Sequence, residues 1–298
     1  MTKSSLAMNV PKIVPPSKAT ADSTADSAPV ERSHVTRRRV MVNVLRILFG
    51  VVIVGGWEIG ARTGWIDPFF WGQPSRIWAQ IVTWVQHGTA QGPLWEQIYT
   101  TMKETVLGFL VGVFLGIIFG IALGRIRLLA DVLGPYIKAA NSIPRVVLGS
   151  IFIISLGLGT PSKVALATVL VFFVVFFNAF QGVREVDTNL IANARILGAS
   201  SRQLSARVIL PSALSWIIAS MHTAFGFALV GAVVGEYLGA VQGIGLMIQT
   251  AQGTFNVNGV FAAMAILAAV ALTAEAFITW LENRLLRWRP KTDISDRL

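Results

Sequence analysis

The sequence predicts an all-α, polytopic membrane protein with about six transmembrane helices. Hydrophobic residues make up 54% of the 298 positions and charged residues only 13%, which is too few charges for a soluble domain of this length. Long apolar runs recur along the chain, and most are long enough, at about 1.5 Å per helical residue, to cross a hydrocarbon core of about 30 Å. Lysines and arginines gather in alternate connections between these runs, as in multi-pass membrane proteins.

The two ends of the chain are predicted to be cytoplasmic tails. Residues 1–36 are rich in Ser, Thr, Ala and Pro with few large apolar side chains, so we expect them to be disordered. The transmembrane domain then occupies residues 37–289, and residues 290–298 form a short second tail. Three arginines precede the first run at residues 37–39. Since further spans follow, a charge cluster that orients the first span is favoured over a twin-arginine export signal.

Three uncharged runs, at 105–124, 164–183 and 208–235, predict the second, fourth and fifth spans. Less regular runs predict the first, third and sixth spans, at about 40–60, 146–160 and 257–274. With a cytoplasmic N-terminus, 21 of the 25 lysines and arginines fall in cytoplasmic segments. We therefore expect both termini and the segment 184–210 in the cytoplasm.

The outer connection between residues 62 and 103 is rich in tryptophan. Indole rings prefer the headgroup layer, so an interfacial helix is predicted at about Pro74–Gln86. An aromatic platform for substrate is the alternative, but anchoring in the headgroup layer is the commoner role of tryptophan at this depth.

The second span has a glycine at every fourth position. These residues form a groove on one helix face, where a neighbouring backbone can approach closely. The predicted helix-packing residues are Gly108, Gly112, Gly116, Gly120 and Gly124. The sequence leaves open whether the partner helix belongs to the same subunit or to a second copy.

The cytoplasmic segment before the fifth span has the pattern of two short helices. Gly198 can end the first helix, and Ser200 with Gln203 can form a capping box that starts the second. Pro211 suits the first turn of the span that follows. Apolar residues recur at three-, four- and seven-residue steps, which predicts a common helix face for Ile191, Ala194, Leu197, Leu204 and Val208. An ordinary amphipathic helix at the membrane surface accounts for the same pattern.

This segment resembles the EAA loop of ABC importer permeases, whose pattern is Glu-Ala-Ala, three residues, Gly, nine residues, an aliphatic residue, one residue and Leu-Pro. Ala194 matches the second alanine, Gly198 the glycine, Val208 the aliphatic residue, and Leu210 with Pro211 the end. Ala192 and Asn193 replace the Glu and the first Ala, so no charge contact is carried over. The resemblance implies an ATPase-coupling loop made by Ala194, Arg195, Leu197, Gly198, Ala199, Ser200, Leu204, Val208, Leu210 and Pro211.

The resemblance extends over about residues 60–285, to permeases of the nitrate, sulfonate and taurine importer group. It rests on Leu107-Gly108-Phe109, Ser142-Ile143-Pro144, Leu156-Gly157-Leu158-Gly159, and Gly235-Glu236-Tyr237-Leu238-Gly239-Ala240 followed by Gly243-Ile244-Gly245. The chain departs from the group at Glu104, where an arginine is common, and at Arg145 and Ser150, where many members carry prolines.

Membership of this group implies a type I ABC importer permease fold and a division of labour among subunits. The expected partners are a cytoplasmic ATPase subunit that binds ATP and Mg, an extracytoplasmic substrate-binding protein, a second permease subunit in a homodimer, and membrane lipid. This chain has no Gly-x-x-x-x-Gly-Lys-Ser/Thr loop to hold nucleotide, so we expect the ATPase to be another chain. We expect this chain to bind no cofactor or metal and to have no catalytic residue. Its net charge of +10 is explained by lipid headgroups without nucleic acid.

Substrate identity is the weakest inference from the sequence. The group suggests a small anion such as a sulfonate, taurine or nitrate, and the alternative is a pyrimidine-type vitamin precursor. Polar candidates for the pathway are Ser142, Ser150, Ser155, Asn178, Ser220 and His222. A neutral His222, hydrogen-bonded to an adjacent helix, is favoured over a pathway role.

Two other classes compete with an ABC permease. A secondary transporter would explain the spans and His222 but not the EAA-like loop, and the acids Glu236 and Glu275 lie near the ends of spans. A membrane enzyme is disfavoured because the three histidines lie far apart in the sequence and no nucleophile motif is present.

Overall fold

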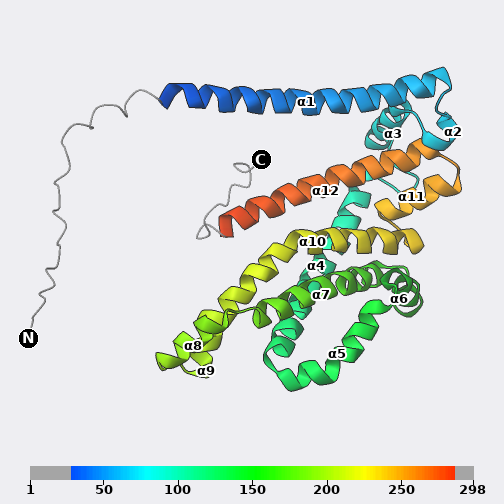
Figure 1. Cartoon of the computed structure of the whole chain (residues 1–298). Helices are drawn as coiled ribbons and strands as arrows, with labels where there is room; N and C mark the ends of the chain where they lie inside the picture. The colour runs from blue at the N-terminus through cyan, green and yellow to red at the C-terminus, as the bar shows by residue number, and fades with distance from the viewer. Residues whose placement is uncertain (1–27, 286–298) are drawn as a thin grey trace, which may run out of the picture. The chain divides into compact units, whose positions relative to one another are not determined.

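The computed structural model describes residues 28–285, and contacts divide the chain into two compact units, Met1–Ile59 and Gly60–Leu298. Within the described residues the regular elements are helices, with one isolated bridge between Thr89 and Gly92 (Figure 1). Among residues 28–285, five helices are long and apolar enough to cross a membrane, and a bent helix pair raises the number to six if it counts as one span. The predictions of an all-α fold and of about six spans are confirmed.

The first described helix is α1 (Ala28–Thr63), and its apolar part, Val40–Thr63, has no buried residue within its most hydrophobic window. This helix begins nine residues before residue 37, where the transmembrane domain is predicted to start. Pro29 and Glu31 suit the first turn of a helix, where a missing N–H costs little and a negative charge is favourable. Residues 1–27 of the predicted N-terminal tail and the whole predicted C-terminal tail, residues 290–298, lie outside the described residues.

Two helices follow α1 in the tryptophan-rich connection. The helix α2 (Pro68–Trp71) is capped by the Asp67 carboxylate, which accepts from the Phe69 N–H at 2.9 Å. The helix α3 (Pro74–His87) matches the predicted helix closely. Four indoles in this region are more than half exposed, which suits the headgroup layer, and they belong to Trp65, Trp71, Trp78 and Trp95.

The third span, predicted at about 146–160, is not formed by those residues alone. The chain instead forms α5 (Arg127–Ser142), a 3₁₀ turn (η1, Arg145–Val147) and α6 (Leu148–Leu156), with a bend of 77° between the two helical parts. The bend lies at Pro144, which restricts the preceding residue to an extended conformation. Gly157, with φ of +81°, then ends α6 after nine residues, about half the length that a membrane crossing needs.

The core of the second unit is the pair α4 (Leu94–Arg125) and α7 (Thr160–Arg184), which share the most extensive helix contact in the structure. All five glycines of the predicted groove face α7. A Cβ atom added to any of them would collide with a small or β-branched residue of that helix, in order Ala167, Val171, Val175, Ala179 and Val183. The glycine groove therefore packs within the subunit, which answers the question that the sequence left open.

The helix α10 (Leu210–Leu238) packs against α7 as well. Ala224 and Ala228 of α10 are fully buried in one cluster with Val171 and Val175 of α7. Near the other end of the contact, a Cβ on Gly231 would lie 2.9 Å from the backbone nitrogen of Ala167. Small residues thus set the spacing of both helix pairs, as expected where lipid supplies no hydrophobic force between helices.

A second cluster joins α11 (Ile244–Gly253) to α12 (Val257–Leu285). Its buried side chains are Ile244, Met247, Ala263 and Ile266, and Trp84 of α3 and Ile98 of α4 pack against them. The part of the chain after α10 is therefore tied to the tryptophan-rich connection and to the start of α4.

Replacing Gly116 by Ala should destabilise the protein, because the new Cβ would lie 2.8 Å from the Val175 Cβ and 3.1 Å from the Phe172 carbonyl oxygen. We expect a cost of about 1–3 kcal/mol from overpacking and a lower Tm in detergent. Gly226→Ala is the matched control, since nothing lies within 4 Å of its Cβ position. Equal melting temperatures of the two variants would contradict the packing assigned to this groove.

Candidate functional site

The segment after α7 folds into the two short helices that the sequence predicts. The helix α8 (Thr188–Ile196) is capped by Asp187, whose carboxylate accepts from the Asn189 N–H at 2.8 Å. Gly198 follows with φ of +79° and donates its N–H to the Arg195 carbonyl at 2.9 Å. The Ala199 N–H reaches back to the Ala194 carbonyl at 3.0 Å, which completes a Schellman motif. The predicted role of Gly198 as the residue that ends this helix is confirmed.

The second helix, α9 (Ser201–Leu204), begins with the predicted capping box. The Ser200 hydroxyl accepts from the Gln203 N–H at 3.3 Å, and the Gln203 side chain accepts from the Ser200 N–H at 2.8 Å. A Schellman motif followed directly by a capping box leaves two residues for the turn, Gly198 and Ala199. The direction of the chain between α8 and α9 is therefore fixed by local hydrogen bonds.

The prediction of one continuous apolar face across this turn is wrong. Leu204 is 7% exposed, whereas Leu197 is 86% and Ile196 83% exposed. Helical periodicity does not carry across the turn at Gly198, so residues on either side of it point in different directions. Two large apolar side chains are left in solvent at the end of α8, which is typical of a surface that a partner covers.

The connection from α9 into α10 is helical throughout. A π-helical turn (η2, Ser205–Ile209) joins them, and the Leu210 N–H donates to the Ser205 carbonyl. Pro211, at the predicted first turn of α10, has no N–H to donate to the Arg207 carbonyl, which favours the wider turn before it. The continuous helical run Ser201–Leu238 has 38 residues and extends roughly 55 Å.

The predicted pathway residues are not brought together by a shared contact. Ser142, Asn178 and Ser220 each donate to a carbonyl of their own helix, and Ser220 is 4% exposed. Ser150 and Ser155 are exposed on α6. In this conformation the six residues do not form one polar site.

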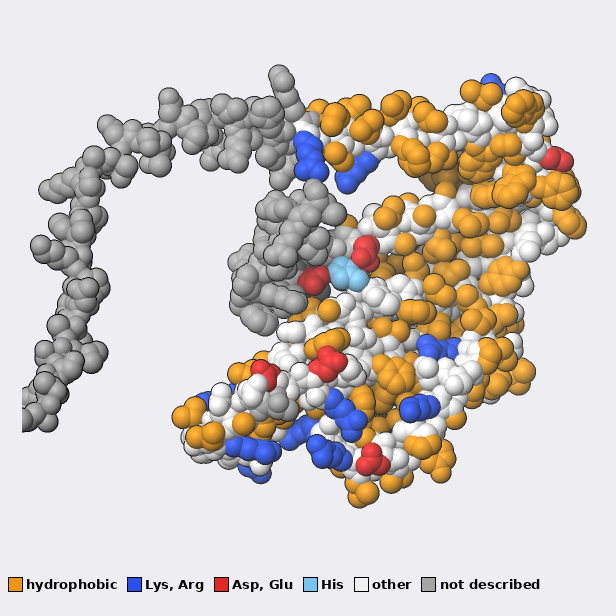
Figure 2. Space-filling model, viewed as in Figure 1, with side chains coloured by type: hydrophobic (Ala, Val, Ile, Leu, Met, Phe, Trp, Pro, Cys, Tyr) orange, Lys and Arg blue, Asp and Glu red, His pale blue; other side chains and the backbone are white. Residues whose placement is uncertain are grey.

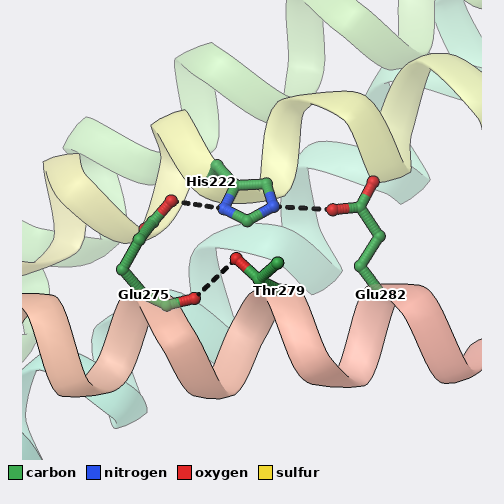
Figure 3. A network of polar contacts seen from close by, with 4 residues as sticks. All are labelled: His222, Glu275, Thr279 and Glu282. Carbon is green, nitrogen blue, oxygen red and sulfur yellow. Dashed lines mark hydrogen bonds and ion pairs between the residues drawn. The ribbon is translucent and has the colours of Figure 1, made fainter. Parts of the chain in front are cut away.

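His222 lies between two carboxylates of α12 (Figure 3). Its Nδ1 is 2.6 Å from Glu275 Oε1, and its Nε2 is 2.6 Å from Glu282 Oε2. The two glutamates are seven residues apart, so they share a helix face two turns apart. The hydrogen bonding to an adjacent helix is as expected. An imidazole donates from both nitrogens only when it is protonated, so this geometry differs from the neutral histidine favoured by the sequence. His222 thus links α10 to α12.

A second polar cluster was missed by the sequence analysis. Glu104 of α4, Lys163 of α7 and Glu236 of α10 are almost wholly buried. Glu236 accepts from the Thr101 hydroxyl at 2.7 Å and from the Gly245 N–H at 2.7 Å. The signal in the sequence was that all three charges lie at the ends of predicted spans that face the same side of the membrane. In the structure these three charged side chains lie where α4, α7, α10 and α11 meet.

This junction caps the start of α11 with side chains from other helices. The first turn of a helix leaves unpaired N–H groups, and three of them are satisfied here. The Gly243 N–H donates to Gln97 Oε1 at 2.8 Å, the Ile244 N–H to Thr101 Oγ1 at 2.9 Å, and the Gly245 N–H to Glu236. The end of α10 that follows η2 is thus joined by one helix to a buried polar junction at its other end.

Comparison with known proteins identifies the family. Residues 112–287 match the binding-protein-dependent transport system inner membrane component family. The chain belongs to this family. A Bacillus subtilis (strain 168) protein named for aliphatic sulfonates transport is 32% identical over 82% of this chain and 87% of its own length. The Halalkalibacterium halodurans formylaminopyrimidine transport permease protein ThiX is 29% identical over 82% of this chain and 95% of its own.

Solved structures agree on the fold. An amino acid ABC transporter matches with a TM-score of 0.53 and 19% identity over 65% of this chain and 92% of that one. The protein is therefore a permease subunit of a binding-protein-dependent ABC importer and not an enzyme, as the resemblance implied. An ATPase and a binding protein are its expected partners.

Thr101→Val should loosen the start of α11, because valine keeps the shape of threonine but removes the acceptor of the Ile244 N–H and the donor to Glu236. We expect faster hydrogen exchange at the Ile244 and Gly245 amides, measured by mass spectrometry. Thr105→Val is the control, since this buried hydroxyl, one turn along, donates to the carbonyl of residue 101 on its own helix. Unchanged exchange in Thr101→Val would show that the cap does not hold α11.

The two contacts of His222 should differ in strength. Its Glu282 partner has a side chain that is 30% exposed, against 48% for Glu275, so the protein shields the Glu282 contact more from its surroundings. Double-mutant cycles with alanine should give a coupling energy of about 0.5–1 kcal/mol for His222 with Glu282, and a smaller one for Glu275. A larger coupling to Glu275 would contradict this ordering. Unfolding in a graded denaturing detergent provides the stabilities.

Proposed function

We propose that α8, α9 and the turn between them form the surface on which the ATPase subunit docks, and that α10 carries its motion into the membrane. The observation that supports this most strongly is the rigid double-capped turn at the position of the EAA-like loop, with Ile196 and Leu197 exposed beside it. A docking surface that transmits force must hold its own shape, and the two capping motifs do this without help from the partner.

The direction of coupling follows from helix continuity. Because α9, η2 and α10 form one helical run, a displacement of α9 moves α10 and, with it, the close contacts that α10 makes with α7. His222 passes the displacement to α12 through its two glutamates. ATP, bound with Mg by the partner ATPase, shifts the permease between states only through a difference in docking energy between them.

In this proposal two copies of the permease form the pathway. The spans lie in the inner membrane of a bacterial cell, and both termini and the α8–α9 surface lie in its cytoplasm. The binding protein delivers substrate to the opposite face. The positive-inside distribution of lysine and arginine supports this orientation. The double-capped turn, which a secondary transporter does not require, favours the ABC mechanism.

Gly198→Val should weaken ATPase docking, since a β-branched residue resists a φ of +79°. We expect at least a fivefold loss of ATPase co-purification and of uptake, with normal amounts of membrane-inserted permease. Gly198→Asn is the matched control: asparagine tolerates this conformation, and nothing lies within 4 Å of the Cβ position. If the valine variant held its ATPase and transported normally, the docking proposal would fail.

For the substrate we propose a small anion of the sulfonate class, with taurine and nitrate as related candidates. Support comes from the sequence resemblance and from the Bacillus relative named for aliphatic sulfonates. The alternative is a pyrimidine-type vitamin precursor, favoured by the similarity to the formylaminopyrimidine permease protein. Liposomes containing permease, ATPase and binding protein should accumulate a labelled alkanesulfonate when ATP is present. Accumulation of formylaminopyrimidine instead would overturn the sulfonate assignment.

A further inference from the structure

A cavity of about 270 Å³ lies where the ends of α4 and α7 meet η2 and the start of α10. Its walls are apolar and come from three helices: Ile121 of α4, Val183 of α7 and Leu210 of α10. Its polar side chains come from the same end of the protein and are Arg125, Arg202 and Ser205. The proposed function places α9, which carries Arg202, on the docking surface, but it assigns no ligand to this cavity.

The charge of the cavity has one sign. Arg125 and Arg202 are exposed, and no Asp or Glu is among the residues that line the cavity. Arg125 donates from Nη2 to the Ser205 hydroxyl at 2.8 Å, which uses one of the five N–H donors of its guanidinium group. Figure 2 shows Lys and Arg side chains gathered at this end of the protein, around α8 and α9. The cavity therefore suits an anion that is apolar on one side.

We propose that this cavity binds one anionic phospholipid, with its phosphate at Arg125 and Arg202 and its glycerol and first acyl carbons against the apolar walls. The helix α4 ends at Arg125, and basic side chains at the end of a span attract the phosphates of anionic lipids. The change from apolar wall to basic rim matches the change along a phospholipid molecule. A free phosphate ion would leave the apolar walls uncovered.

The lipid would act on the connection between the docking helices and α10. Ser205, Ala206 and Ile209 all line the cavity, and they belong to the π-helical turn that joins α9 to α10. A ligand packed against this turn restricts its bending, so it makes α10 follow α9 more closely. This consequence for transport rests on the proposed function, whereas lipid binding itself does not depend on it.

Native mass spectrometry of the complete importer in detergent tests the binding. With added phosphatidylglycerol, we expect the wild type to retain one lipid per permease, and the loss of each arginine in Arg125→Gln and Arg202→Gln to weaken retention roughly fivefold. Arg127→Gln is the matched control, because this exposed arginine lies two residues away and outside the cavity. Ala206→Leu fills the cavity without changing its charge and should also reduce retention.

Three outcomes would overturn the proposal. Equal retention of phosphatidylglycerol by the double arginine variant and by Arg127→Gln would exclude a lipid site here. Displacement of the lipid by millimolar inorganic phosphate would indicate a site for the free ion. Loss of the ATPase subunit from the double variant, with unchanged lipid retention, would make the cavity part of the docking surface.

A second measurement addresses the effect on coupling. In nanodiscs, replacing phosphatidylcholine by phosphatidylglycerol should raise the rate of ATP hydrolysis by the wild-type importer. The same change of lipid should not raise the rate of the double arginine variant, but it should raise that of Arg127→Gln. A response in the double variant equal to that of the wild type would contradict the effect on coupling. If the Gly198→Val experiment contradicts the docking proposal, we still expect the wild-type permease to retain the lipid.

Discussion

The close approach of α4 and α7 is the constraint on which the rest of the structure depends. Inside a bilayer, apolar surfaces gain little from leaving lipid, so helices associate only where their backbones can come near each other. Five glycines, one per turn of α4, allow this along the whole contact. With α7 held in place, α10 can pack against it through its own small residues, and the polar groups of three helices meet at one end.

Those polar groups decide which parts of the protein move together. At one end of α10, Glu236 and Thr101 fasten the start of α11 with short hydrogen bonds between buried groups. Nearer the other end, His222 links α10 to α12 through partly exposed carboxylates, which is a weaker kind of contact. The close contact of α10 with α7 extends to both sides of His222, from Ala213, which lies against Gly182, to Gly235, which lies against Lys163.

The sequence predicted best what is decided locally. Gly198, Ser200 and Gln203 act within one turn of themselves, and the structure contains the capping motifs that their order indicates. It predicted least where distant segments meet. The bend at Pro144 could not be predicted from hydrophobic composition, because composition gives the polarity of a segment but not the angle between two helices. Lys163 looked like an ordinary charge at a membrane surface, and its burial depends on α4 and α10, which no pattern within α7 reveals.

The central claim is that the α8–α9 surface contacts the ATPase subunit. A photo-crosslinking residue in place of Leu197, which is 86% exposed, would test it most directly in the assembled importer, with the 92% exposed Trp65 as the control position. The account predicts a crosslink from position 197 to the ATPase that strengthens or weakens with ATP, and none from position 65. A crosslink from position 197 to the binding protein, or to lipid alone, would contradict it.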